Sequence, residues 1–319
     1  MRAASSAAAL ALSLTATATA HAHGRPPFVG ELQLHPTDPD VLVGRATWGL
    51  VLSEDGGESW RWICAAVTGA DPTREDPAIL VVPDGSVLVG TFGGLTRSTP
   101  DRCDWAPPDP QLADVFVIDL QARRAAPETV YALATSGIEP DQLYRSTDQG
   151  RSFSPLGPPV EEILLERVRP APSDPERIYL SGAIPASADG EREAHLLRSD
   201  DGGASFSRRR VPLEDGERNL HLLAVDPTDP DRALLRVTRR TTDARPERLL
   251  LTEDGGERFA TVLTARDLSD AAFSDDGARA WATSRTLDGL FRSEDGGRTF
   301  ENVTPGNLPC VEARGDALW

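Results

Sequence analysis

The residues Ser53-Glu54-Asp55-Gly56-Gly57-Glu58-Ser59-Trp60 form an eight-residue pattern that recurs along the chain. Near-complete copies also begin at Ser146, Ser199, Thr252 and Ser293. A decayed copy, 98–105, keeps the spacing from Ser98 to Trp105 but has Pro100 where the Asp should be. Successive copies start 45, 48, 53, 53 and 41 residues apart. This period is typical of repeat units that each contain four strands.

Each position of the pattern has a structural reason. The Ser or Thr and the Asp two residues later can accept backbone N–H groups across a tight turn. The second Gly suits a positive φ, and the final aromatic residue begins the next strand. We therefore expect a structural role for these residues: Ser53, Asp55, Gly57, Trp60, Ser146, Asp148, Gly150, Phe153, Ser199, Asp201, Gly203, Phe206, Thr252, Asp254, Gly256, Phe259, Ser293, Asp295, Gly297 and Phe300.

The flanks of the pattern repeat as well. A Leu stands three residues before every copy, and an apolar segment and a polar Pro/Asp-rich turn precede that Leu. The six leucines are Leu50, Leu95, Leu143, Leu196, Leu249 and Leu290. The sequence of one unit therefore predicts, in order, a strand, a Pro/Asp turn, a strand, a loop, a strand, the eight-residue turn described above (here called the boxed turn) and a final strand.

The boxed turn resembles the Asp-box, or BNR, repeat of sialidase-like β-propellers, and the resemblance covers about residues 28–319. It implies an all-β propeller of four-stranded antiparallel blades. It does not imply one activity, because sialidases, xyloglucanases, sortilin-type receptors and photosystem II assembly factors all carry such repeats. A calcium-binding loop is the alternative for the Asp-Gly runs, but they lack the distal Glu of an EF-hand loop.

Six units are complete, and 311–319 has the pattern of a strand, a turn and a strand that would begin a seventh. A ring of six blades with a packed tail and an incomplete ring of seven are both possible, and we favour the second. An incomplete ring would expose strand edges and the apolar faces of its first and sixth blades. The expected domains are a signal peptide over 1–22 and the propeller over 23–319.

The N-terminus predicts export. Met1-Arg2 is followed by an uncharged stretch, Ala7 to Ala20, and by two A-x-A cleavage patterns, as in a signal peptide. A disordered Ala-rich tail is the alternative. The segment is too short to span a membrane. We expect a secreted, periplasmic or cell-surface protein, in which Cys64 and Cys103 form a disulfide and Cys310 is left over.

The charge excludes some partners. The chain has 33 basic residues, all of them Arg, against 50 acidic residues, and its net charge is −17. Nucleic acid and anionic membranes are poor partners for so acidic a protein. No C-x-x-C, G-x-S-x-G or phosphate-binding loop occurs, so the sequence predicts no metal site and no cofactor.

The resemblance places ligands at the axial face, which the loops between second and third strands build. The candidate binding residues there are Arg45, Trp48, Phe92, Asp141, Arg239, Arg285 and Asp288. Trp48 and Phe92 could stack on a sugar or on a partner side chain, or pack between blades instead.

We expect a binding or scaffold protein with a protein or carbohydrate ligand, and a secreted glycoside hydrolase is the alternative. Sialidases need a loop Tyr and an Arg-Ile-Pro signature, whereas Tyr131, Tyr144 and Tyr179 all fall within repeat strands and the signature is absent. A xyloglucanase needs a facing pair of carboxylates, for which Asp141, Asp189 and Asp288 are loop candidates.

Overall fold

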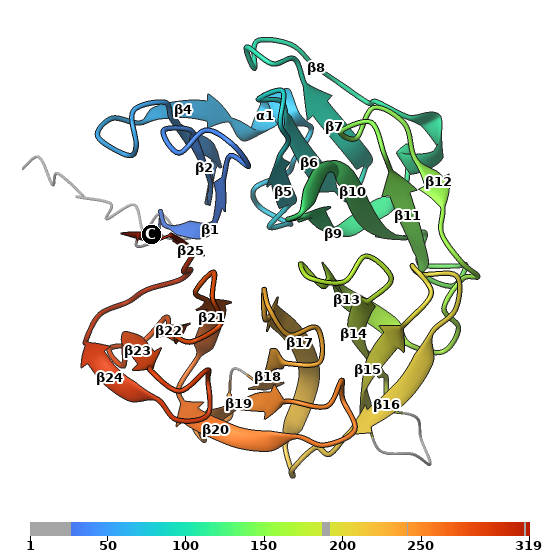
Figure 1. Cartoon of the computed structure of the whole chain (residues 1–319). Helices are drawn as coiled ribbons and strands as arrows, with labels where there is room; N and C mark the ends of the chain where they lie inside the picture. Colours follow the sequence, from blue (N-terminus) through green and yellow to red (C-terminus); the bar gives the residue numbers. More distant parts are fainter. Residues whose placement is uncertain (1–26, 187–191, 241, 316) are drawn as a thin grey trace, which may run out of the picture.

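The computed structural model describes residues 27–186, 192–240, 242–315 and 317–319. Six four-stranded antiparallel sheets, here called blades 1 to 6 in chain order, stand around a central axis (Figure 1). A two-stranded sheet, β25–β26, lies between blades 6 and 1. The predicted all-β propeller with six complete blades and the start of a seventh is confirmed.

Each blade uses four consecutive strands, and the first lies nearest the axis. Blade 1 contains β1 (Val29–Leu34), β2 (Leu42–Ala46), β3 (Gly49–Ser53) and β4 (Arg61–Cys64). Blade 2 contains β5 (Ala78–Val81), β6 (Val87–Thr91), β7 (Gly94–Ser98) and β8 (Trp105–Ala106). Blade 3 contains β9 (Phe116–Arg123), β10 (Ala126–Thr135), β11 (Gln142–Ser146) and β12 (Ser154–Pro155).

The second half of the ring repeats this order. Blade 4 contains β13 (Leu164–Pro170), β14 (Ile178–Ile184), β15 (Glu193–Ser199) and β16 (Ser207–Val211). Blade 5 contains β17 (Glu217–Val225), β18 (Ala233–Arg239), β19 (Glu247–Thr252) and β20 (Ala260–Ala265). Blade 6 contains β21 (Leu268–Phe273), β22 (Ala280–Ser284), β23 (Leu290–Ser293) and β24 (Glu301–Thr304). The remaining elements are α1 (Ala65–Thr68), the 3-10 turn η1 (Pro110–Leu112), β25 (Ala313–Arg314) and β26 (Ala317–Leu318).

The repeated Leu explains how neighbouring blades pack. Side chains alternate along a strand, so the Leu and the residue after it lie on opposite faces of the blade. Leu196 of blade 4 packs in a cluster with blade 5, and Leu197 packs in a cluster with blade 3. Leu249 and Leu250 do the same one blade further on. The apolar core is therefore a series of layers between blades.

The boxed turns have one hydrogen-bond pattern in all five near-complete copies. In blade 4, the Ser205 amide donates to Asp201 Oδ1 at 2.9 Å, and the Gly203 amide donates to Ser199 Oγ at 2.8 Å. Gly203 has a φ of 94°, which an L side chain rarely adopts. The Gly202 amide donates to Glu176 O in the turn between the first two strands, so both turns lie at one end of the ring, here called the box face.

Hydrogen bonds and apolar contacts link the two-stranded sheet to both neighbouring blades. Val311 and Ala313 pack with Ala272 and Trp281 of blade 6. On the other side, the Arg314 guanidinium donates to the carbonyl of His35 in blade 1. Blades 1 and 6 therefore meet through this sheet, which occupies the axial part of a seventh position in the ring (Figure 1).

The predicted disulfide is wrong, because Cys64, Cys103 and Cys310 are all free thiols. Cys64 ends β4, four residues after the box aromatic residue, whereas Cys103 lies in the box-face turn, two residues before the aromatic residue. Six positions at the rise of an extended strand separate the two by about 20 Å along the blade. A disulfide needs Cα atoms within roughly 7 Å.

Some predictions concern residues outside the described part of the chain. They are the signal peptide over 1–22 and the hydrolase candidate Asp189. In the part that the structure describes, no helix has the length and apolar character needed to cross a bilayer.

Candidate functional site

The innermost strands carry charged residues that contact one another across blade boundaries near the axis. On β13, Glu166, Arg167 and Arg169 occupy positions where a fully covered strand would be apolar. Arg169 donates to Asp119 Oδ2 on β9 at 2.7 Å, and Glu166 meets His221 on β17. Three consecutive blades thus contribute charged side chains that contact one another. They stand on β9, β13 and β17, the strands nearest the axis in Figure 1.

Glu166 and His221 form the central pair of this cluster. His221 Nε2 lies 3.1 Å from Glu166 Oε2. Burial raises the pKa of Glu166 to about 7, against the opposing effect of Arg167 and Arg192. Burial and the nearby Arg167 and Arg236 hold the pKa of His221 well below its ordinary value. At neutral pH the imidazole is therefore neutral, and the carboxyl is close to its midpoint.

Four arginines lower the pKa of the His221 imidazole through their charge, namely Arg167, Arg236, Arg169 and Arg285. Arg236 is the strand partner of His221 and makes two hydrogen bonds to Glu247, at 2.9 and 3.2 Å. Arg167 lies 3.6 Å from Asp119 and is 36% exposed, and Arg285 lies 3.0 Å from Asp267 and is 41% exposed.

Because Arg167 and Arg285 keep exposed surface, they are the members of the cluster best able to receive an anionic group. Glu166 and His221 could exchange a proton with the same ligand.

Two of the predicted binding residues near the axis make structural contacts. Arg45 forms an ion pair with Glu31 at 3.1 Å and donates to the carbonyls of Asp76 and Pro77, which ties blade 1 to blade 2. Asp141 is buried and accepts the Leu165 amide at 2.7 Å, which ties blade 3 to blade 4.

Arg239 and Asp288 also make structural contacts. The Arg239 side chain is 6% exposed and contacts Glu214 and Glu217. Asp288 Oδ2 accepts the Arg266 amide at 3.1 Å.

Trp48, Phe92 and Arg285 are the predicted binding residues with the most exposed surface. Trp48 lines an apolar pocket on blade 1. The Phe92 ring packs edge-on against Phe116 with centroids 4.6 Å apart. These three residues belong to three different blades, 1, 2 and 6.

Sequence reasoning missed Glu166, Arg167, His221 and Arg236. For Glu166, Arg167 and His221 a signal was present, because charged or titratable residues in the first strand of a blade are not expected in an apolar layer; Arg236 lies on the second strand of blade 5. The predicted binding residues were placed in loops instead, because loops carry most binding residues.

The chain's three tyrosines lie away from this cluster. Tyr131 and Tyr179 are buried in the layers between blades, and Tyr144 packs against the core of blades 2 and 3. None of the three tyrosines is therefore placed in this cluster, where a sialidase-type nucleophile would be needed. Among the described residues, no three His, Cys, Asp or Glu side chains gather closely enough to hold a metal ion.

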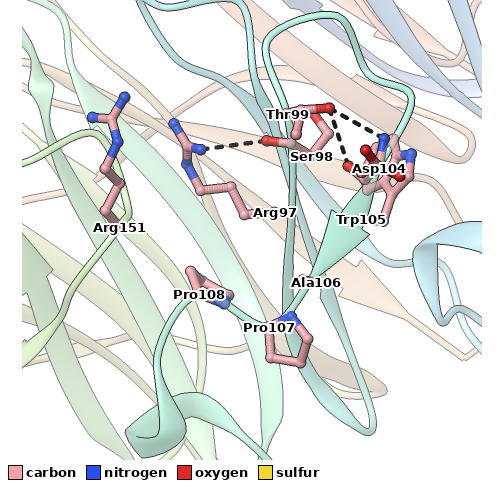
Figure 2. Close-up of a pocket in the computed structure, with 9 residues that line it drawn as sticks. All are labelled: Arg97, Ser98, Thr99, Asp104, Trp105, Ala106, Pro107, Pro108 and Arg151. Atoms are coloured by element: carbon pink, nitrogen blue, oxygen red, sulfur yellow. Dashed lines mark hydrogen bonds between the residues drawn. The ribbon is translucent and has the colours of Figure 1, made fainter.

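A second concave surface lies at the outer edge of blades 2 and 3 (Figure 2). It encloses about 280 Å³ beside Trp105, Pro107 and Pro108, with Arg97 and Arg151 next to each other. Both arginines form ion pairs with Asp84, at 2.7 Å for Arg97. The two guanidinium groups of this groove therefore share one carboxylate.

Comparison with known proteins supports the fold. The family model described as "Sortilin, neurotensin receptor 3" matches residues 141–285, which is less than half of the chain. No curated protein matches the sequence.

Similar solved structures include a GH74 xyloglucanase from Xanthomonas campestris, with a TM-score of 0.59 and 18% identity over 85% of this chain and 45% of that one. An ancestral GH74 enzyme has a TM-score of 0.65 and 15% identity over 87% of this chain and 38% of that one. YCF48 from Cyanidioschyzon merolae has a TM-score of 0.58 and 15% identity over 90% and 89%.

The chain spans less than half the length of either GH74 structure. Identities this low establish the architecture and leave the activity open. The five boxed turns, the six four-stranded blades and the sortilin-type match agree with one another. The chain is a sialidase- and sortilin-like Asp-box β-propeller.

Proposed function

We propose that this chain is an exported binding protein without enzymatic activity that holds an acidic protein or carbohydrate ligand at its axial cluster. The carrying observation is the gathering of four arginines around His221 in a chain whose net charge is −17. A local concentration of guanidinium groups inside an acidic surface favours one small anionic group over a large anionic polymer. The N-terminal signal pattern supports export.

The exposed arginines identify the ligand contact. Guanidinium groups bind carboxylates through paired hydrogen bonds, so Arg167 and Arg285 should hold a carboxylate of a sugar acid or of a protein side chain. Neutral His221 and half-protonated Glu166 would accept or donate hydrogen bonds to neighbouring hydroxyl or amide groups.

Titration with glucuronic acid, N-acetylneuraminic acid and an oligoglutamate peptide tests this proposal, with glucose as the neutral control. We expect at least one acidic probe to bind in a salt-dependent manner. Arg167→Ala and Arg285→Ala should each weaken that binding about tenfold, because a charge-assisted hydrogen bond is lost. Arg258→Ala is the matched control, since its side chain is 89% exposed at the box face. Binding equally strong in all three variants would refute the assignment.

A glycoside hydrolase is the second candidate, and Glu166 is the observation that favours it. A carboxyl with a pKa of about 7 can act as a general acid near neutral pH. We nevertheless expect purified protein to release no product from a fluorogenic sialoside or from xyloglucan. Turnover that Glu166→Gln abolishes while Glu162→Gln retains it would replace the binding proposal with a hydrolase. Glu162 serves as the control because its side chain is 71% exposed.

A further inference from the structure

The Glu166 carboxyl lies on an irregular part of the innermost strand β13. Glu166 is an extra residue between Leu165 and Arg167, whose partners on β14 are consecutive. Such a β-bulge bends the strand and re-aims its side chains, and bulges are common next to functional sites. Here Glu166 Oε2 lies 3.1 Å from His221 Nε2 on the neighbouring blade. The bulge therefore belongs to the contact between blades 4 and 5.

The surroundings of this carboxyl favour its protonated form. Glu166 Oε2 is shielded from solvent and, within the described ranges, takes part in no hydrogen bond of good geometry. A buried carboxylate oxygen without a donor is costly, whereas a protonated carboxyl can turn its O–H toward an imidazole nitrogen that carries no proton. The pKa of Glu166, which burial raises to about 7, agrees with this geometry. Glu166 therefore changes its charge close to neutral pH.

The charges that act on this pair come from several elements. They belong to Arg167 and Arg169 on β13, Arg192 before β15, Arg236 on β18 and Arg285 after β22. Burial and these arginines hold the pKa of His221 well below its ordinary value. The imidazole therefore stays neutral near pH 7, and Glu166 is the member of the pair whose charge changes there.

Arg167 connects Glu166 to the anion site proposed above. Its guanidinium donates to the backbone carbonyl of Glu166 at 3.4 Å and lies 3.6 Å from Asp119. The carboxyls whose charges act on it are Asp119 on β9, Glu31 on β1, Glu166 on β13 and Asp270 on β21. Burial raises the pKa of Asp270 to about 6, so Asp270 is the other group in this set that must be tested.

We propose that Glu166 couples ligand binding at the axial cluster to proton uptake, so that the chain holds an anionic ligand more tightly in acidic than in alkaline surroundings. This inference rests on the proposed function, because it takes Arg167 and Arg285 as the residues that receive the anion. Protonated Glu166 is neutral and leaves the charge of Arg167 to the ligand. Ionised Glu166 places a like charge beside the ligand and weakens its binding. Because linkage is reciprocal, a bound anion makes Glu166 harder to ionise, and binding near pH 7 takes up part of a proton.

Calorimetric titration of the wild-type chain with glucuronic acid, N-acetylneuraminic acid and an oligoglutamate peptide tests this coupling. The carboxyls of these probes stay ionised between about pH 5.5 and about pH 8.5, since ordinary carboxyl pKa values lie near 4. We expect the dissociation constant to rise about tenfold across this range, a typical coupling between two sites. At pH 7, titrations in Bis-Tris and in Tris, two cationic buffers with different heats of ionisation, should show net proton uptake. Circular dichroism at each pH checks the fold.

Three variants assign the coupling to one carboxyl. Glu166→Gln keeps the shape of the side chain without its charge, so it should lose both the pH dependence and the proton uptake and bind tightly throughout. Glu162→Gln is the matched control, because Glu162 is 71% exposed, and it should behave as the wild type does. Asp270→Asn should keep the change in affinity centred near the pKa of Glu166, about 7.

The possible results separate this inference from the proposed function. Binding of a probe with equal affinity across the pH range, or a pH dependence that Glu166→Gln retains, would overturn the inference and leave the proposed function intact. A pH dependence that Asp270→Asn removes would also overturn it, because the coupling would then belong to blade 6. Absence of binding of all three probes at the acidic end, where binding should be tightest, would refute the proposed function and the inference with it.

Discussion

Replacement of Glu217 by Ala should lower the free energy of unfolding by about 3–5 kcal/mol, the cost typical of breaking a buried ion pair on one side. The Glu217 side chain is fully buried at the start of β17. It accepts two hydrogen bonds from Arg248, at 2.7 and 2.6 Å, and one from the Glu214 amide at 2.6 Å. Arg239, its strand partner in β18, lies 3.4 Å away.

Removal of this carboxylate leaves two guanidinium groups without their central anion in blade 5. Chemical denaturation monitored by tryptophan fluorescence measures the loss, and circular dichroism checks that the variant folds. Glu214→Ala is the matched control, because Glu214 contacts the same two arginines but is 58% exposed. Similar losses in both variants would mean that burial does not govern this cluster.

The fold was predictable because each repeat unit contains several independent sequence signals of the same structure. The box residues, the Leu and the Pro/Asp turn all occur at fixed spacing, and the hydrogen bonds of Ser199, Asp201 and Gly203 match the roles expected of them. The two strands of 311–319 were predicted from the residue pattern of this segment, which has no box of its own. The sequence of a single unit cannot predict how the two-stranded sheet β25–β26 contacts blade 1.

The axial cluster was harder to predict, because its members come from different blades. Glu166 and His221 are 55 positions apart and become neighbours only when blades 4 and 5 pack together. The cysteine pairing failed for a related reason. Cys64 and Cys103 belong to equivalent outer regions of adjacent blades, but they lie on opposite sides of the boxed aromatic residue, and the strand direction carries them apart.

The junction between blade 6 and the two-stranded sheet contains two partly buried carboxyl groups. Burial raises the pKa of Asp270 to about 6, and burial together with the charge of Asp270 raises the pKa of Glu312 to about 8. The Val311 amide donates to Asp270 Oδ2 at 3.2 Å, so Asp270 lies directly at the contact. Both groups favour their neutral forms in the folded chain.

Attachment of this sheet should therefore weaken as the pH rises. In the unfolded chain these carboxyls lose their protons near pH 4 to 5, whereas the folded chain keeps them until about pH 6 and 8. The folded state binds more protons in this window, so stability falls between pH 4.5 and 8.

Hydrogen-exchange protection of the Glu312 and Trp319 amides, corrected for the intrinsic pH dependence, should fall by about 2 kcal/mol between pH 5 and pH 8.5. This value is smaller than the free-energy change that the full pKa shift of Glu312 would give, because Glu312 is partly exposed and solvent screens its charge. Glu312→Gln should remove most of the decrease and leave the variant better protected than the wild type at pH 8.5. Glu301→Gln, at a side chain 67% exposed on β24, should keep the wild-type dependence. Protection that stays constant with pH in the wild type would show that both carboxyls remain solvated at the junction.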